Sequence, residues 1–306
     1  PVDAPFDAAW SGVHPVQVTL SGQPVTPPMR ILPAFPSVRV RSLVNGDAIA
    51  MLMEWDDATR DESVLGVDRF ADAAAIQFAL GTGTSICMGQ QAGGLNIWHW
   101  KADWAADLAG RLDVDDVHPG MPDDPHYGGA LDPADPSLTA DGFFAGRAAG
   151  NPRSAATLSS SVEDLNAIGF GTLTPQPASG QNVHGASEYR NGVWRVVLSR
   201  TLAPGDANDA AIRTGGAAGV VAFAVWDGSR GDRDGIKSVS AWLALSLPRE
   251  PNSLLDIWPF MLMLAMALLA SGLIIWYGAR QPAAGLGGIG GGLEGPRGDA
   301  SEPGEH

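Results

Sequence analysis

Cysteine is almost absent from this sequence, because the 306 residues contain only Cys87. One cysteine excludes an internal disulfide framework, a CxxCH attachment motif, and any zinc or iron–sulfur site built from several thiolates. Positive charge is also scarce: 19 Lys and Arg stand against 34 Asp and Glu, giving a formal net charge of -15. Nucleic-acid phosphates would be repelled by this charge, which excludes a nucleic-acid partner, whereas a basic protein partner would be attracted.

The motifs of common enzymes are missing as well. The sequence contains no GxSxG, no HExxH and no Walker loop. Its six histidines are scattered, and only His118 and His126 lie close together, within one loop. We therefore expect a chain that is not an enzyme by itself.

Short segments rich in Val, Ile and Trp, bounded by turn residues, predict β-strands. These segments are residues 39–55, 74–80, 95–100, 192–200, 219–228 and 238–247. Asn-Gly pairs at 45–46 and 191–192 predict hairpin turns, and helical periodicity is limited to 102–112. We expect residues 1–250 to form an antiparallel β-sandwich, immunoglobulin-like or cytochrome-domain-like, followed by one transmembrane helix.

Two segments are too rich in Gly, Pro and acidic residues to pack. Residues 113–137 are acidic and aperiodic, which predicts a long surface loop. Their carboxylates could bind calcium, but the EF-hand spacing is absent and a solvated loop is favoured. The end of the chain, residues 281–306, predicts a disordered tail.

A run of 23 uncharged residues from Ile257 to Ala279 is the longest apolar segment. At about 1.5 Å per residue, such a helix spans a bilayer core of roughly 30 Å. Trp258 near one end, and Trp276 and Tyr277 near the other, are typical of membrane interfaces. A buried core helix is the alternative, but so long an uncharged run is rare in soluble folds.

We therefore predict a transmembrane helix within residues 251–280. Arg280 follows the run directly, so the positive-inside signal is weak. The large acidic domain that precedes the run favours an orientation with the N-terminus outside the cell membrane.

The segment 86–103, ICMGQQAGGLNIWHWKAD, places a methionine in a Gly-rich turn before a Trp-rich strand. The Met88 thioether is a soft donor that suits haem iron or copper. Residues 95, 97 and 99 of the strand share one face, and Asn96, Trp98 and Trp100 share the other. These indoles could wall a planar cofactor, but Met88 as a core gap-filler and the Trp residues as ordinary core are favoured from composition.

A second unusual segment, residues 224–242, has a strand that ends in a long charged loop. Lys237 appears there just before another strand. Taken by itself, Lys237 is a solvated surface charge.

Together these segments resemble the haem b-binding gamma subunit of periplasmic molybdenum enzymes related to dimethyl sulfoxide reductase, such as ethylbenzene dehydrogenase, dimethyl sulfide dehydrogenase, and selenate and chlorate reductases. The matching segments are residues 87–104, 146–154, 162–174, 191–202 and 221–242. Their order follows the family, and together they span roughly residues 40 to 247.

The resemblance implies one non-covalent haem b with an axial methionine at Met88 and an axial lysine at Lys237. It further implies an electron-transfer subunit at the periplasmic face of the cytoplasmic membrane. Its partners would be a molybdopterin catalytic subunit, an iron–sulfur subunit, and a cytochrome c or quinone-linked carrier. The best-studied members of the family are soluble, so the C-terminal span is a departure that puts the electron partner in doubt.

Two alternatives remain beside this hypothesis. The first is a membrane-tethered β-sandwich module without a cofactor, which binds carbohydrate or acts as a sensor and would present an exposed Trp platform. The second is a copper carrier that uses Cys87, Met88 and His99.

Overall fold

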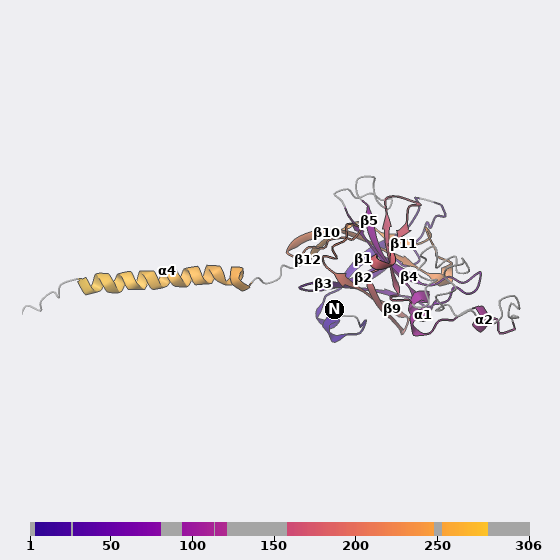
Figure 1. Cartoon of the computed structure of the whole chain (residues 1–306), viewed down its shortest axis with the longest axis horizontal. Helices are drawn as coiled ribbons and strands as arrows, with labels where there is room; N and C mark the ends of the chain where they lie inside the picture. The colour runs from indigo at the N-terminus through magenta and orange to yellow at the C-terminus, as the bar shows by residue number, and fades with distance from the viewer. Residues whose placement is uncertain are drawn as a thin grey trace, which may run out of the picture. The chain divides into compact units, whose positions relative to one another are not determined.

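The computed structural model describes residues 4–25, 27–80, 94–112, 114–120, 158–247 and 253–280. Contacts divide the chain into two compact units, Pro1–Glu250 and Pro251–His306. The strands belong to the first unit and the long helix α4 to the second (Figure 1).

The described residues of the first unit contain twelve strands, and every pair is antiparallel. One set comprises β1 (Val16–Gly22), β2 (Ser37–Asn45), β3 (Ala48–Asp56), β9 (Val193–Thr201) and β8 (His184–Arg190), paired in that order. The other comprises β7 (Thr174–Pro175), β6 (Val162–Ala167), β5 (Leu95–Lys101), β4 (Ala73–Ala79), β10 (Gly216–Trp226) and β11 (Ser238–Ser240), with β12 (Leu243–Leu247) also paired to β10. Short helical segments are η1 (Ala8–Gly12), α1 (Ala102–Ala109), α2 (Val114–Val117), η4 (Ala178–Gly180) and η5 (Gly228–Arg230).

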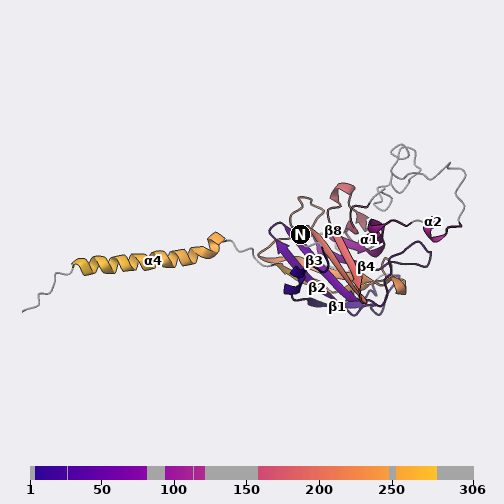
Figure 2. The same ribbon diagram turned by 90° about the horizontal axis from the view of Figure 1, so that it is seen from below.

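Strand β1 belongs to both sets, because its first half pairs with β2 and its second half with β11. Among the described strands, β7 and β8 end the order without pairing to each other, so the sheet is not a closed barrel. The two sets pack face to face: Trp100 of β5 meets Trp55 of β3 and Trp194 of β9, with ring centroids 6.1 and 5.0 Å apart. The predicted antiparallel β-sandwich is therefore confirmed, and Figure 2 shows the β1, β2, β3 and β8 side of it.

Both predicted hairpins are present. The backbone φ is 53° at Asn191 and 78° at Gly192, the paired positive values that a two-residue type I′ turn requires. Gly46 lies between β2 and β3 with φ of 52°. The predicted helix at 102–112 is confirmed as α1, although it ends at Ala109, and the four-residue α2 lies inside the loop predicted at 113–137.

A buried polar network joins the two sheets inside the sandwich. Arg200 of β9 has a fully buried side chain whose Nη1 lies 3.0 Å from Asp209 Oδ1 and donates to Asn96 Oδ1 at 3.0 Å. Asn96 of β5 in turn donates its Nδ2 to Asp164 Oδ1 of β6. Burial, followed by repulsion from Asp209, raises the pKa of Asp164 to about 7.

This pKa predicts that the stability of the fold depends on pH. An Asp164→Asn variant should show a weaker pH dependence. Folded Asp164 keeps its proton while the unfolded chain releases it, so the free energy of unfolding should fall as pH rises from about 4 to 7. Asparagine mimics the protonated acid, so above pH 7 the variant should be more stable by on the order of 1–3 kcal/mol. Urea unfolding of the full chain in detergent at pH 5, 7 and 8 measures this, with Asp206→Asn on the surface as the control. Burial also raises the pKa of Asp72 to about 7, so both chains keep that contribution. Equal pH dependence of the variant and the native chain would contradict the prediction.

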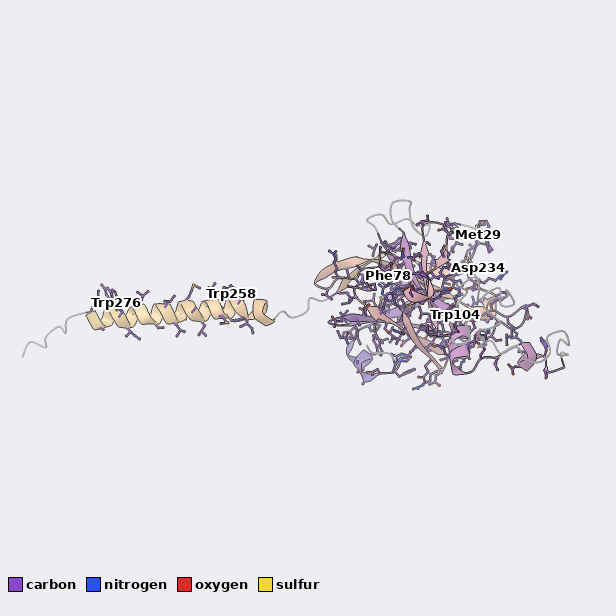
Figure 3. All side chains as sticks on the ribbon, in the orientation of Figure 1. Met29, Phe78, Trp104, Asp234, Trp258 and Trp276 are labelled. Atoms are coloured by element: carbon purple, nitrogen blue, oxygen red, sulfur yellow. The ribbon has the colours of Figure 1, made fainter. Side chains whose placement is uncertain are left out.

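The second unit contains α4, Ser253–Arg280. Residues 257–280 have a mean hydropathy of 2.1, and none of them is buried against the rest of the protein. The helix is therefore long and apolar enough to cross a membrane. Trp258 and Trp276 lie toward its two ends (Figure 3), at the positions where interfacial aromatics are found.

Candidate cofactor site

Strands β4, β5, β6 and β10 carry a second apolar cluster on the face that points away from the sandwich interior. We call this cluster the outer apolar face. Its buried members are Ala73, Ala75, Leu95, Ile97, Leu165, Ala167 and Trp226, packed with Ala79, Ala224 and Trp242. Alanine predominates where this face lies on β4 and β10, so that part of the surface is flat, without large protruding side chains. Such a floor suits a flat, mainly apolar molecule.

Lys237 lies at the edge of this face, in the turn that leads into β11. Its side chain is half-buried, and its amine stands 4.9 Å from the centre of the Trp226 ring. Burial lowers the pKa of Lys237 to about 8, and the charge of Asp234 opposes this shift. Among the described residues, no carboxylate lies within ion-pair distance of the Lys237 amine. The interpretation of Lys237 as a solvated charge is therefore wrong.

His99 of β5 lies on the same face, next to Trp226. The two ring centroids are 4.8 Å apart at an interplanar angle of 32°. His99 Nε2 has neither a hydrogen-bond partner nor solvent contact. Burial, followed by the charges of Lys101 and Lys237, lowers the pKa of His99 well below its ordinary value, so the imidazole is neutral.

A cavity of about 370 Å³ opens beside these side chains. His99, Trp226 and Asp234 line it, together with Lys101, which forms an ion pair with Glu163. The site therefore combines an aromatic wall, a buried polar atom without a partner, and a nearby amine that loses its proton easily.

Ordinary core, the favoured interpretation of the indoles on β5, is confirmed, and the alternative of a cofactor wall is wrong. The division of the strand into two faces is as predicted, but Trp98 and Trp100 point into the sandwich and have no exposed surface. They pack with the aromatic residues of the core, as expected for ordinary core residues. The aromatic that adjoins Lys237 is Trp226, which the sequence did not single out; its place at the end of β10, eleven residues before Lys237, was the available signal.

The predicted ligand Met88 lies outside the described residues, as does Cys87. The axial pair Met88–Lys237 therefore stays a prediction. What the described residues offer is one nitrogen donor of lowered pKa beside a flat apolar floor, and an imidazole nitrogen free to hydrogen-bond a ligand. These features fit a haem, which is planar, mostly apolar and bound through axial donors.

Comparisons with known proteins found a matching family model and several relatives. Residues 7–238 match a family model described as ethylbenzene dehydrogenase. A protein of Haloferax mediterranei named as a respiratory nitrate reductase heme subunit is 28% identical over 243 residues, covering 78% of this chain and 66% of that protein. The chlorate reductase gamma subunit of Ideonella dechloratans is 28% identical over 190 residues, 61% of this chain and 55% of its own.

A third relative is the dimethylsulfide dehydrogenase gamma subunit of Rhodovulum sulfidophilum. It is 28% identical over 249 residues, which cover 77% of this chain and 71% of the relative. The chain thus spans between about half and just over two thirds of the lengths of these proteins.

Proposed function

This chain belongs to the ethylbenzene dehydrogenase family, and on that basis we propose that it is the haem-carrying electron-transfer subunit of a membrane-anchored oxidoreductase complex. The observation that carries the proposal is the half-buried Lys237 at the edge of the outer apolar face, whose amine lies 4.9 Å from the Trp226 ring and has a pKa that burial lowers to about 8. An amine binds a metal only in its neutral form, so this environment prepares the lysine for ligation.

In this proposal Lys237 and Met88 are the two axial ligands of one non-covalent haem b. The bound haem would supply a one-electron iron couple. Lys237 would give up its proton to bind, the outer apolar face would exclude water, and His99 Nε2 would be free to donate to or accept from a polar group of the cofactor. Two protein ligands would keep small molecules from the metal, which favours electron transfer over catalysis.

Chain length allows Met88 to reach the outer apolar face. Leu80 donates its N–H to the Gly94 carbonyl at 2.9 Å, so the two residues that flank 81–93 are held together at one end of β4 and β5. Lys237 lies toward the other end, because Trp226 pairs with Ala73. That separation is roughly 20 Å, and the six residues from Gly94 to Met88 span up to roughly 20 Å when extended.

We further propose the setting of the subunit. Its β unit would stand on the periplasmic side of the cytoplasmic membrane, with α4 as the anchor and the N-terminus outside. A molybdopterin subunit would perform the bond chemistry, and an iron–sulfur subunit would exchange electrons with this chain. The second electron partner would be a cytochrome c or a quinone-linked carrier.

A cofactor-free carbohydrate-binding or sensor module has no specific support. Such a module would present tryptophan on its surface, but no tryptophan in the described part of the first unit is exposed. The described residues therefore favour a haem subunit over this alternative.

The decisive test is the optical spectrum of the full chain purified in detergent after haem-replete expression. We expect a sharp reduced α-band, low-spin iron, and a pyridine haemochrome of extractable haem b. Met88→Ala should remove the low-spin signal and lower the reduction potential, because a thioether stabilises the reduced iron. The control is Met29→Ala, which changes a methionine that is 52% exposed. A colourless chain, or one that holds copper in place of iron, would refute the proposal.

A further inference from the structure

The loop between β6 and β7, residues 168–173, presents three large apolar side chains to solvent. The exposed fractions are 60% for Ile168, 36% for Phe170 and 47% for Leu173. No ionisable side chain occurs from residue 165 to residue 183, although 17% of the chain is charged. Large apolar side chains gathered on one uncharged loop form an exposed patch of the kind that marks a contact with another protein or with a membrane.

The β6–β7 loop is held in shape by its own hydrogen bonds. The Ile168 N–H donates to the Thr172 hydroxyl oxygen at 2.9 Å, and this hydroxyl donates to the Gly169 carbonyl at 2.7 Å. Gly171 has a φ of 76°, which glycine adopts without strain. A Cβ added at Gly169 or at Gly171 would meet nothing within 4 Å. The apolar side chains are therefore preorganised on a loop whose glycines face open space.

The loop lies at the end of the sandwich from which the chain continues toward α4. Four antiparallel pairings, through β5, β4 and β10, connect β6 with β12, so these two strands run toward the same end. Ala167, the last residue of β6, lies in the same cross-strand row as Ala79 of β4. The adjacent Phe78 lies in the row of Leu243 on β12. Four strand spacings amount to roughly 20 Å, which is the lateral distance between the two strands.

Chain length keeps this end of the sandwich close to any membrane that α4 crosses. Strand β12 ends at Leu247 and α4 begins at Ser253, and six residues span at most about 20 Å. A bilayer surface that α4 enters therefore lies within about 20 Å of the end of β12. The covalent structure thus brings a lipid interface, which accepts Ile, Leu and Phe side chains, to the end that carries the β6–β7 loop.

We propose that the β6–β7 loop is a second membrane contact of this chain, with Ile168, Phe170 and Leu173 inserted at the lipid interface. This contact rests on the proposed anchoring by α4 and does not depend on haem. It sets the direction in which the sandwich faces. Trp226 and the adjoining Lys237, at the other end of the eleven-residue β10, then point away from the bilayer toward the aqueous phase.

The test uses the full chain reconstituted into phosphatidylcholine liposomes, with the photoreactive residue benzoylphenylalanine in place of Ile168 or Phe170. Illumination should attach phospholipid to the chain from both positions, which mass spectrometry of the chain detects. Resistance of each chain to alkaline extraction is measured separately, because it reports the insertion of α4 alone. Chains that are extracted from the liposomes would refute the anchoring itself, whereas inserted chains without lipid adducts would refute the contact of the loop.

Leu32 is the matched control position, because it is also apolar, is 77% exposed and lies toward the opposite end of the sandwich. A Cβ at Gly22 would lie 2.5 Å from the carbonyl oxygen of Ile31, the residue before it. Gly22 pairs with Ser238. Ser238 in turn pairs with Val225, close to the end of β10. Benzoylphenylalanine in place of Leu32 should therefore give no lipid adducts.

A charge on the loop should weaken the contact. With the photoreactive residue at position 170, Leu173→Asp should lower the yield of lipid adducts severalfold, because a carboxylate is costly at the lipid interface. Leu32→Asp adds the same charge at the control position and should leave the yield unchanged. Circular dichroism checks that both variants fold. Equal yields from positions 32 and 170, adducts with a second copy of the chain in place of lipid, or an unchanged yield in Leu173→Asp would overturn the proposal.

Discussion

Replacing Lys237 with alanine is expected to remove the low-spin spectrum of the haem-loaded chain, or to remove the haem itself. The amine is the only proposed nitrogen ligand, and among the described residues no carboxylate forms an ion pair with it beside Trp226. A five-coordinate, high-spin iron of altered reduction potential should remain where haem is retained.

Absorption and electron paramagnetic resonance spectra, with a redox titration, measure this outcome. Arg60→Ala is the control, because it removes the same charge from a side chain that is 55% exposed and paired with Glu62 on the surface. A native spectrum in Lys237→Ala together with a changed spectrum in His99→Ala would transfer the ligand role to His99.

The sequence predicted most of the fold because the strong strands carry local signals. Both residues of the Asn-Gly pair in the β8–β9 turn adopt positive φ, as does Gly46 in the β2–β3 turn, and β9 is rich in β-branched residues. Strands β1, β6, β7 and β8 were not predicted. β8, HGASEYR, is a polar edge strand whose pairing depends on β9 rather than on its own composition.

The site was harder to predict because its parts come from distant segments. Lys237 looks solvated in a charged loop, and only the approach of Trp226 and the β5 face buries its amine. The alternation of β5 was correctly predicted, but a period of two cannot tell which face points inward. The structure assigns Trp98 to the interior and His99 to the outer face.

The carboxylates of Asp61, Asp72 and Asp227, which lie within 4.8 Å of one another, show the same limit. Asp61 and Asp72 look like ordinary loop residues, and nothing local in the sequence relates them to Asp227. Their meeting is fixed by the antiparallel pairing of β10 with β4, which sets Trp226 opposite Ala73 and so places Asp227 beside Asp72.

A second large effect is expected at Arg200, whose fully buried guanidinium joins the two sheets. Arg200→Met should destabilise the β-sandwich by about 3–5 kcal/mol, because Asp209 and Asn96 Oδ1 then lose their cationic partner. The substitution also removes the contact between the guanidinium and Trp98, in which Cζ lies 4.8 Å from the ring centroid. With roughly 2–4 °C of melting temperature per kcal/mol for a domain of this size, the midpoint should fall by about 10 °C.

Differential scanning calorimetry of the full chain measures this, with Arg60→Ala as the control. Arg60 pairs with Glu62 on the surface and is 55% exposed, so its loss should cost no more than about 1 kcal/mol. Adding Asp209→Asn to Arg200→Met should restore part of the stability, because the penalty comes chiefly from the carboxylate that is left unpaired. If the double variant is no more stable than Arg200→Met alone, the loss reflects packing around Trp98, and the ion pair does not hold the sheets together.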